Sequence, residues 1–226
     1  MTDPTADLLP VGLEDRLPAS ARALTRARRA ALDAMDAHGY DRVIPPLIEF
    51  EKSMATRMSG VATRRMFRFV DPASLRTLAL RSDITVQVGR IAATSMAGSP
   101  RPLRLCYAGE VAVIRADQLD PARQKLQLGA ELIGSDSAEA AGEVVALAVE
   151  ALAAAGASGI SVDFTLPDLD GVPRSLGTSA IFSGCSGKYS TLTCMPGLKS
   201  STNERETSFS PFTNCPEGVL MTIGRL

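Results

Sequence analysis

The sequence predicts an α+β fold built around a long β-hairpin, with helices before and after it in the chain. Residues 123–134 alternate between polar and apolar side chains, RQKLQLGAELIG, which is the two-residue period of a strand. Residues 104–118 supply the preceding arm, RLCYAGEVAVIRADQ. Apolar residues recur at helical spacing over 18–40, and 136–156 is a long alanine-rich stretch. These observations indicate that the hairpin and the helices share one core.

The composition narrows the class of protein. The chain has 226 residues, 45% hydrophobic and 22% charged, which is typical of one large globular domain or two small ones. A net charge of −1 and a 4% aromatic content without Trp argue against nucleic acid as a partner. The opening MTDPTADLLP lacks the features of a secretory signal, and no apolar run approaches the ~18 residues of a membrane span. We therefore expect a cytoplasmic protein without membrane contact.

The first helix is predicted from PASARALTRARRAALDAMDAHGY. Gly39 is placed to end it in a left-handed turn, and His38 falls in the last turn near the negative end of the helix dipole. A short strand follows in DRVIPPLIEFE, interrupted by Pro45 and Pro46. Because proline lacks the N–H that a strand donates, this segment is expected at an edge, a kink or a subunit contact.

Two further strands and a helix precede the hairpin. RRMFRFVDP (64–72) and TLALRSD (77–83) predict a strand pair around a turn. Ser82 or Asp83 can cap a helix over ITVQVGRIAATSM, residues 84–96. The arginines of the RRMFRF stretch are expected on a solvated loop.

The chain after the hairpin changes character near residue 170. The alanine-rich helix is expected to be capped at Ser135 or Ser137 and to close near Gly156, and residues 160–169 predict a last strand. Residues 1–170 contain 31 alanines, whereas the remaining 56 residues contain one alanine and 16 Ser and Thr. The sequence therefore predicts a domain over 1–170 and a poorly structured tail over 171–226, with a frame-shifted origin as a sharper hypothesis.

No metal, cofactor or nucleophile is predicted. Cys106, Cys185, Cys194 and Cys215 form no CxxC pair, and His38 is the only histidine. A zinc site or a disulfide framework is therefore not expected. Cys106 is expected to be a small core residue.

The hairpin carries the candidate site. Its second arm places Gln127, Gly129 and Glu131 on one face and the leucines on the other, so that one face packs on a core and the other is available. Glu131 offers a counter-charge and Gln127 an oriented acceptor for an ammonium group, with room left by Gly129. The alternative is an ordinary amphipathic strand whose polar side chains are solvated.

Val113 on the first arm is expected to lie beside this site, in the middle of the face that Tyr107 and Gly109 share. A site for a phosphate or carboxylate would use an arginine there, because the planar guanidinium binds oxyanions through two nitrogens. Valine cannot do so.

Four motifs in register resemble one family. LALRSDIT (78–85), LRLCYAGEV (103–111), RQKLQLGAELIG (123–134) and GYDRVIPPLIEFE (39–51) are similar to the catalytic core of histidyl-tRNA synthetase. The whole stretch MFRFVDPASLRTLALRSDITVQVGRIAAT is more similar to the regulatory paralogue, the regulatory subunit of ATP phosphoribosyltransferase. The resemblance covers roughly residues 9–169. It implies a class II synthetase-like, mainly antiparallel sheet flanked by helices, incomplete at the C-terminus.

The resemblance also implies residue roles. Residues matching Asp83, Thr85, Gln127 and Glu131 contact histidine in the synthetase, the acidic ones near its amino group. The arginine that holds the carboxylate and the ATP phosphate matches Val113, and the acidic residue two positions later is Arg115. The later motifs of the synthetase have no counterpart in 170–226. Histidine could therefore bind, but no adenylation and no catalytic residue are expected.

The function implied is that of a non-catalytic regulatory subunit. Members of this paralogous family assemble with the short catalytic ATP phosphoribosyltransferase subunit, a glycosyltransferase, and support the first step of histidine biosynthesis and its feedback by histidine. The motif at 39–51 implies self-association. Two alternatives are a divergent histidyl-tRNA synthetase and a truncated chain without function.

Overall fold

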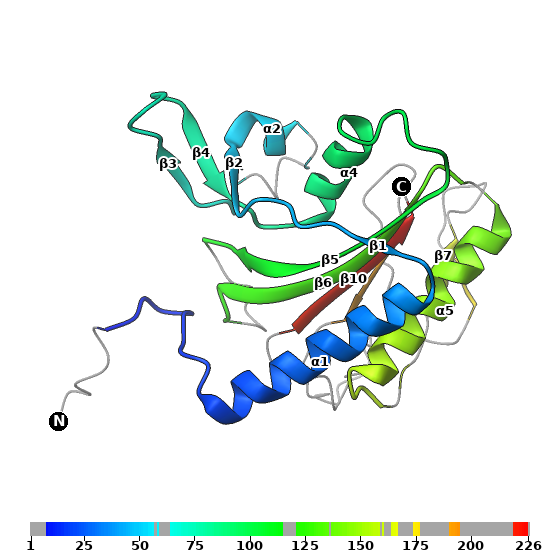
Figure 1. Cartoon of the computed structure of the whole chain (residues 1–226). Coiled ribbons are helices and arrows are strands. Elements are labelled where there is room, and N and C mark those ends of the chain that lie inside the picture. The colour runs from blue at the N-terminus through cyan, green and yellow to red at the C-terminus, as the bar shows by residue number, and fades with distance from the viewer. Residues whose placement is uncertain are drawn as a thin grey trace.

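Figure 1 shows the chain as a computed structural model, with a central sheet between two long helices on one side and a shorter helix on the other. The structure describes residues 8–56, 58, 64–114, 121–135, 137–158 and 160, and the backbone of four later strands. In chain order the elements are α1 (Pro18–Ala37), β1 (Asp41–Arg42), β2 (Ile48–Phe50), α2 (Glu51–Ala55), β3 (Arg68–Val70), β4 (Thr77–Leu80), α4 (Thr85–Ala93), β5 (Leu103–Ala112), β6 (Gln124–Ile133), α5 (Ala138–Ala154), β7 (Phe164–Leu166), β8 (Arg174–Leu176), β9 (Ser190–Cys194) and β10 (Val219–Arg225).

The hairpin β5–β6 is the centre of a five-stranded sheet with the order β1-β5-β6-β10-β9. Its two strands run antiparallel, in register from Leu103 opposite Ile133 to Ala112 opposite Gln124. On either side of the hairpin the neighbour is parallel: β1 beside β5, and β10 beside β6. β9 is antiparallel to β10, and β7 and β8 form a separate antiparallel pair. The sheet is therefore mixed, with an antiparallel centre.

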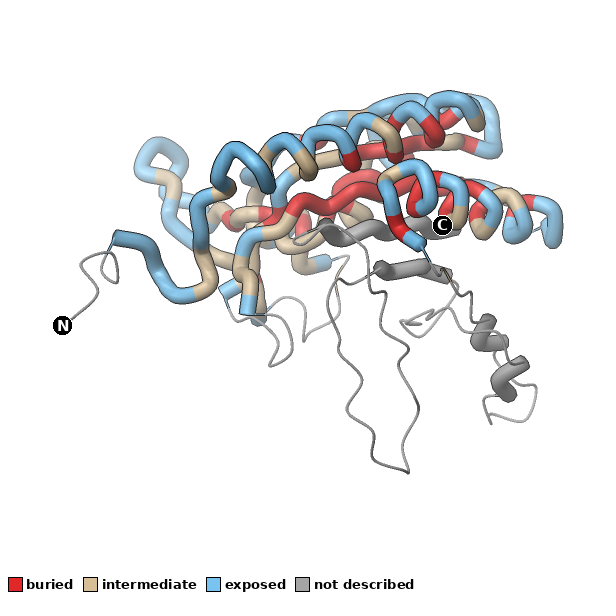
Figure 2. Tube along the Cα trace, turned by 90° about the horizontal axis from the view of Figure 1, so that it is seen from below, coloured by how far each residue is buried: buried red, intermediate tan, exposed pale blue. Residues whose placement is uncertain are grey.

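Helices α1 and α5 cover one face of the hairpin. The core on this side contains Ala31, Leu32, Met35, Leu126, Leu128, Ala130, Leu132, Val144, Leu147, Ala151 and the thiol-bearing Cys106. Figure 2 shows these buried stretches along the strands and along the inner sides of the helices. Ser137 caps α5 by accepting the Ala140 N–H at 3.1 Å, and Gly39 ends α1 with a φ of 76°. The two helices are also joined by a 2.7 Å contact between His38 Nε2 and Glu150 Oε2.

Helix α4 covers the opposite face of the hairpin. Its buried side chains at Ile84, Val88 and Ala92 pack on β5 residues, including Leu105 and Tyr107. A smaller antiparallel sheet, in the order β2-β4-β3, continues from this layer. The end of β4 meets the end of β5, where the Ala112 N–H donates to the Arg81 carbonyl at 3.0 Å.

Most predicted elements lie where the sequence placed them. The helix over 18–40 is α1, the strand pair over 64–83 is β3 and β4 running antiparallel, and the hairpin is β5 and β6. The helix after Asp83 begins at Thr85, and the Asp83 carboxylate accepts the Thr85 N–H at 3.0 Å. The α+β class is confirmed, with a sheet that is antiparallel in its centre and parallel on both flanks of the hairpin.

The predicted tail falls largely outside the described residues. Within 171–226 the structure gives only the backbone of β8, β9 and β10, so the division of the chain at residue 170 stays a prediction. Residue 115 and the end of the first hairpin arm, up to 118, also lie outside the described part. In the described part of the chain, no helix is both long and apolar enough to cross a membrane.

Candidate functional site

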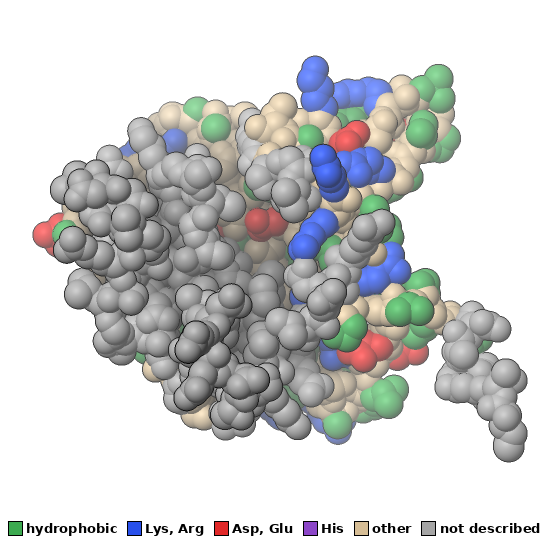
Figure 3. Space-filling model, turned by 180° about the vertical axis from the view of Figure 1, so that it is seen from behind, with side chains coloured by type: hydrophobic (Ala, Val, Ile, Leu, Met, Phe, Trp, Pro, Cys, Tyr) green, Lys and Arg blue, Asp and Glu red, His purple; other side chains and the backbone are tan. Residues whose placement is uncertain are grey.

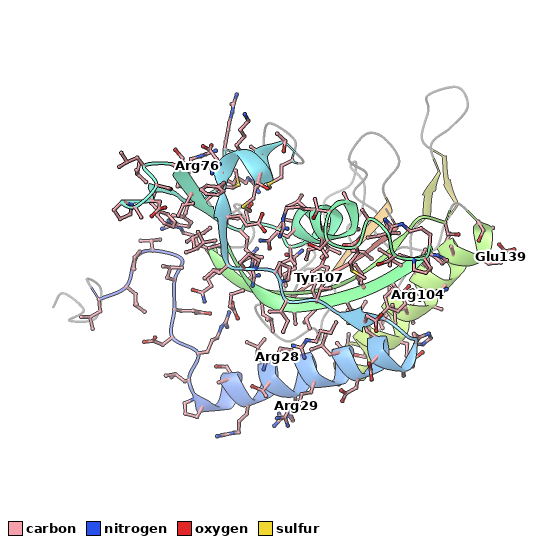
Figure 4. The ribbon with its side chains drawn as sticks, turned by 45° about the horizontal axis from the view of Figure 1, so that its top comes forward. Arg28, Arg29, Arg76, Arg104, Tyr107 and Glu139 are labelled. Carbon is pink, nitrogen blue, oxygen red and sulfur yellow. The ribbon has the colours of Figure 1, made fainter. Side chains whose placement is uncertain are left out.

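A buried cluster of polar side chains lies between α4 and the hairpin. Its members come from the loop before α4, from the first residue of α4 and from the two hairpin strands, and they are Asp83, Thr85, Tyr107, Gln127 and Glu131. Figure 4 shows Tyr107 on the sheet beneath α4. Gln127 and Glu131 are 1% and 0% exposed, so the face predicted to be available is covered by the helix. Buried polar side chains of this kind need partners, because each lost water contact costs free energy.

Gln127 fixes the start of α4. Its Oε1 accepts the Ile84 N–H at 2.8 Å, and its Nε2 donates to Asp83 Oδ1 at 2.8 Å. The same Asp83 oxygen accepts the Thr85 N–H. An amide that donates at one end and accepts at the other thus holds one carboxylate and one helix N-terminal N–H in place. The predicted neighbours Asp83 and Gln127 are in direct contact.

A second chain of hydrogen bonds reaches Glu131. The hydroxyls of Thr85 and Tyr107 are 2.8 Å apart, and the Tyr107 hydroxyl donates to Glu131 Oε1 at 3.1 Å. Since tyrosine has one hydroxyl proton and gives it to Glu131, the Thr85 hydroxyl is the donor to Tyr107. Glu131 Oε2 is buried and has no hydrogen-bond partner in the described structure.

The environment of Glu131 disfavours its charge. Burial raises the pKa of Glu131 to about 8, and the nearby Asp83 carboxylate adds to the rise, while hydrogen bonds from hydroxyl groups oppose it. The carboxyl is therefore mostly protonated near neutral pH. A cationic group placed at Oε2 would lower this pKa and supply the missing partner, because an opposite charge favours the ionised form.

Val113 lies one residue beyond the end of β5. Its N–H donates to the Arg123 carbonyl at 2.9 Å, and its side chain is partly exposed. Two arginines lie at this end of the hairpin: Arg123, which directly precedes β6, and Arg81, which follows β4. Arg81 is 7% exposed, and it crosses Gly109 so closely that a Cβ on this glycine would overlap its Nη2.

Both arginines are fixed to the main chain. Arg81 donates through Nε to the Glu110 carbonyl at 2.7 Å and through Nη1 to the Pro45 carbonyl at 2.9 Å. Arg123 donates in the same way to Val113 and Val11, at 3.3 and 3.2 Å. An oxyanion is held firmly when two nitrogens of one guanidinium donate to it. In the described structure each of these two guanidinium groups is thus held by two main-chain carbonyls, which restricts how far either can turn toward a ligand.

The four residues predicted for histidine are thus brought together, and sequence reasoning missed two others. Tyr107 was recognised as sharing the face but not as the partner of Glu131, and Arg81 was not considered. The signal for Arg81 was Gly109, because a glycine in a strand interior often marks the close approach of another group. Cys106 is buried as predicted, with the pKa of its thiol raised to about 11 by burial. Among the described residues no three His, Cys, Asp or Glu side chains converge as metal ligands would.

The arginines of the RRMFRF stretch lie at or near the surface. The Arg68 guanidinium pairs with Glu51, and the other arginines of that stretch, Arg64 and Arg65, lie at the surface or partly exposed. Figure 3 shows Lys and Arg side chains gathered on the side of the molecule that carries the smaller sheet. Arg76 lies over the ring of Phe50, 3.3 Å from its centroid. These contacts fit a solvated surface.

An antiparallel hairpin with flanking parallel strands, helices on both faces and a polar cluster at the start of α4 defines a class II aminoacyl-tRNA synthetase-like fold. The family profile described as histidyl-tRNA synthetase matches residues 12–179. The chain therefore belongs to the histidyl-tRNA synthetase family.

Curated relatives carry a more specific name. A protein of Rhodospirillum centenum named ATP phosphoribosyltransferase regulatory subunit is 48% identical over 173 residues, which are 75% of this chain and 45% of the relative. One of Gluconobacter oxydans with the same name is 45% identical over 74% of this chain and 44% of the relative. The chain thus spans less than half the length of these relatives.

Solved structures agree with the family. A structure titled ATP phosphoribosyltransferase regulatory subunit/histidyl-tRNA synthetase, from Bacillus halodurans, is 31% identical with a TM-score of 0.60, over 70% of this chain and 40% of the other. The histidyl-tRNA synthetase of S. aureus is 25% identical with a TM-score of 0.54, over 66% of this chain and 35% of the other.

Proposed function

We propose that the chain acts as a non-catalytic regulatory subunit of ATP phosphoribosyltransferase. In this role it assembles with the short catalytic subunit, a glycosyltransferase, in the cytoplasm and makes the first step of histidine biosynthesis responsive to histidine. The names of the curated relatives support the assignment. The observation that carries it is a polar cluster with two carboxyl groups, Asp83 and Glu131. It lies beside an end of the hairpin where two described arginines, Arg81 and Arg123, are each bound to two main-chain carbonyls.

Histidine is the proposed ligand of the polar cluster. Its ammonium group would lie near the acidic side chains Asp83 and Glu131, with Gln127 and Thr85 fixing their positions. Activation of the bound amino acid requires a cation that grips its carboxylate and the ATP phosphate together. Losing one such preorganised donor costs on the order of 10²–10³ in rate. Binding without activation is therefore the proposed outcome.

The experiment that tests this function is reconstitution. The full chain is co-expressed with the catalytic subunit, the complex is isolated through a tag on the latter, and phosphoribosyl transfer is measured with and without histidine. We expect a stable complex, activity that needs the chain, and inhibition by histidine that Glu131→Gln weakens about tenfold, since a lost contact to a charged group is worth about this factor. Asp33→Asn, at an exposed position on α1, is the matched control. Absence of a complex would contradict the proposal.

We also propose that the segment 39–51 mediates self-association. Ile44 is 80% exposed, and Leu47 and Ile48, close to it in the sequence, are 46% and 40% exposed. Apolar side chains gathered in this way are typical of contact surfaces. Ile44→Lys is expected to shift the protein toward the monomer in light scattering after gel filtration. Val11→Lys, at a similarly exposed position outside this segment, is expected to leave the mass unchanged.

A further inference from the structure

We propose that Tyr107 is a positioning residue for the ligand site: its hydroxyl holds one oxygen of Glu131 so that the other, Oε2, is presented to the cationic group of a bound ligand. The inference rests on the proposed function, because it takes histidine as the probe. It assigns the role to a residue that touches Glu131 and not the ligand.

The geometry of Tyr107 fits such a role. Its side chain is completely buried, and its ring packs among Ile84, Val88 and Leu105 under α4. The ring therefore cannot turn away without opening this core. Its hydroxyl accepts a hydrogen bond from Thr85 and donates one to Glu131. The hydrogen bonds therefore run from the helix toward the carboxyl.

The two oxygens of Glu131 consequently differ. Oε1 has the Tyr107 donor, whereas Oε2 is buried without a partner in the described structure. A buried polar atom without a partner is rare in folded proteins and calls for a reason, such as a group that binds there. A carboxyl in an acidic, buried surrounding suits a cation, because a cation supplies both the missing hydrogen bond and the missing charge.

Release of the Glu131 proton on ligand binding is a measurable consequence of this arrangement. Among the described elements packed against Glu131, the titratable groups that face it are Asp83 ahead of α4 and Tyr107 on β5. Burial and Asp83 favour the protonated carboxyl, and the Thr85 and Tyr107 hydroxyls favour the ionised one. When the ammonium group of histidine binds, the Glu131 O–H bond breaks, its proton passes to solvent and the carboxylate pairs with the ammonium.

The test is calorimetric titration of the full chain with L-histidine at pH 7.5, in phosphate and in Tris buffer, whose ionisation heats differ. The difference in observed heat counts the protons released on binding. For the wild type we expect release of most of one proton. For Tyr107→Phe we expect about tenfold weaker binding and a larger proton release, because the carboxyl loses the donor that stabilised its charge. A residue with only a packing role would weaken binding without changing the proton count.

Three further variants complete the test. Tyr40→Phe removes the hydroxyl of an equally buried tyrosine on the other face of the hairpin, which donates to Glu143 at 3.0 Å, and it should change neither affinity nor proton release. Thr85→Val removes the donor behind Tyr107 and should raise the proton release as Tyr107→Phe does, because the Thr85 hydroxyl also favours the ionised carboxyl. Thr85→Ser keeps the hydroxyl and should restore the lower proton release. This pair of variants keeps the test decisive if Tyr107→Phe fails to fold.

A second readout separates this inference from the proposed function. The Glu131 carboxyl carbon is titrated by NMR without ligand, in the wild type and in Tyr107→Phe. A higher pKa in the variant supports the positioning role whether or not histidine binds. An unchanged pKa overturns it, even if histidine binds. If the wild type binds no histidine, the histidine site in the proposed function fails, and the NMR result alone decides on Tyr107.

Discussion

The two faces of the β5–β6 hairpin are both buried, but they differ in chemistry. On one face Leu126, Leu128, Ala130 and Leu132 pack against α1 and α5. On the other, Tyr107, Gln127 and Glu131 lie under α4 with hydrogen bonds among them. Burial of apolar surface stabilises the fold, whereas a buried carboxyl with one unpartnered oxygen costs free energy. The comparison indicates that the first face serves stability, and it supports the proposal that the second face binds a ligand.

The largest expected effect is on the apolar face. Leu128 is completely buried in the core between β6, α1 and α5. Leu128→Ala is expected to lower the free energy of unfolding by about 2–5 kcal/mol, because it removes buried methyl groups and leaves a cavity. Urea denaturation of the two proteins measures this difference. A loss no larger than that of an exposed substitution would show that this face is not the main core.

The polar face is expected to give a pH dependence. With a pKa of about 8 in the folded state and an ordinary value when unfolded, Glu131 holds its proton longer in the native protein. This contribution to stability is complete below the unfolded pKa near 4 and is lost as pH rises through about 8. Between pH 5 and 8 it amounts to on the order of 2–4 kcal/mol.

Glu131→Gln should remove this dependence, because an amide does not titrate. The measurement is urea unfolding at several pH values for the wild type, Glu131→Gln and the surface variant Asp33→Asn. The wild type and Asp33→Asn should lose stability toward pH 8 by more than Glu131→Gln does. Parallel curves for all three proteins would show that Glu131 titrates normally.

A substitution at Gly109 tests the contact between the hairpin and Arg81. A Cβ at Gly109 would overlap the Arg81 guanidinium, which is held by the Pro45 and Glu110 carbonyls. Gly109→Ala is expected to destabilise the protein by about 1–3 kcal/mol, the usual cost of overpacking. Gly142→Ala is the matched control, since its Cβ meets no atom within 4 Å inside α5. This control should stabilise the helix by about 0.5–1 kcal/mol. Equal effects of the two substitutions in calorimetric melting would argue against a fixed Arg81.

The smallest effect concerns the helix that covers the apolar face. Ser137 accepts the Ala140 N–H at the start of α5. Ser137→Ala is expected to cost about 1 kcal/mol in chemical denaturation, the usual value of a helix N-cap. Ser95→Ala, at an exposed position after α4, should change the free energy of unfolding by less than about half as much. If Ser95→Ala cost as much, the cap would not explain the loss.

Local patterns predicted the elements and one half of the site. The alternation of 123–134 placed Gln127 and Glu131 on one face, and helical spacing gave α1 and α5. These patterns report which residues share a face, but not what covers it. Ile84 and the neighbouring residues of α4 cover the polar face because the chain folds back over the sheet. The sequence pattern does not report this, so the burial of the polar face was not predicted.

The contacts that could not be predicted are made by long side chains between residues far apart in the sequence. Arg81 reaches carbonyls 36 residues before and 29 residues after it in the chain, and no sequence period relates such positions. Tyr107 and Glu131 are 24 residues apart, and their contact follows only from the register of β5 and β6. Val113 was expected in the middle of the shared face, but β5 ends at Ala112, so the valine lies just past the strand.

The central claim is that the polar face binds an amino acid without activating it. The most direct measurement is histidine-dependent ATP–pyrophosphate exchange by the purified full chain, at a histidine concentration at which binding is verified. The account predicts exchange no faster than in the absence of histidine, because Val113 carries no cation and the Arg81 and Arg123 guanidinium groups are each held by two main-chain carbonyls. Exchange that rises with histidine would contradict it.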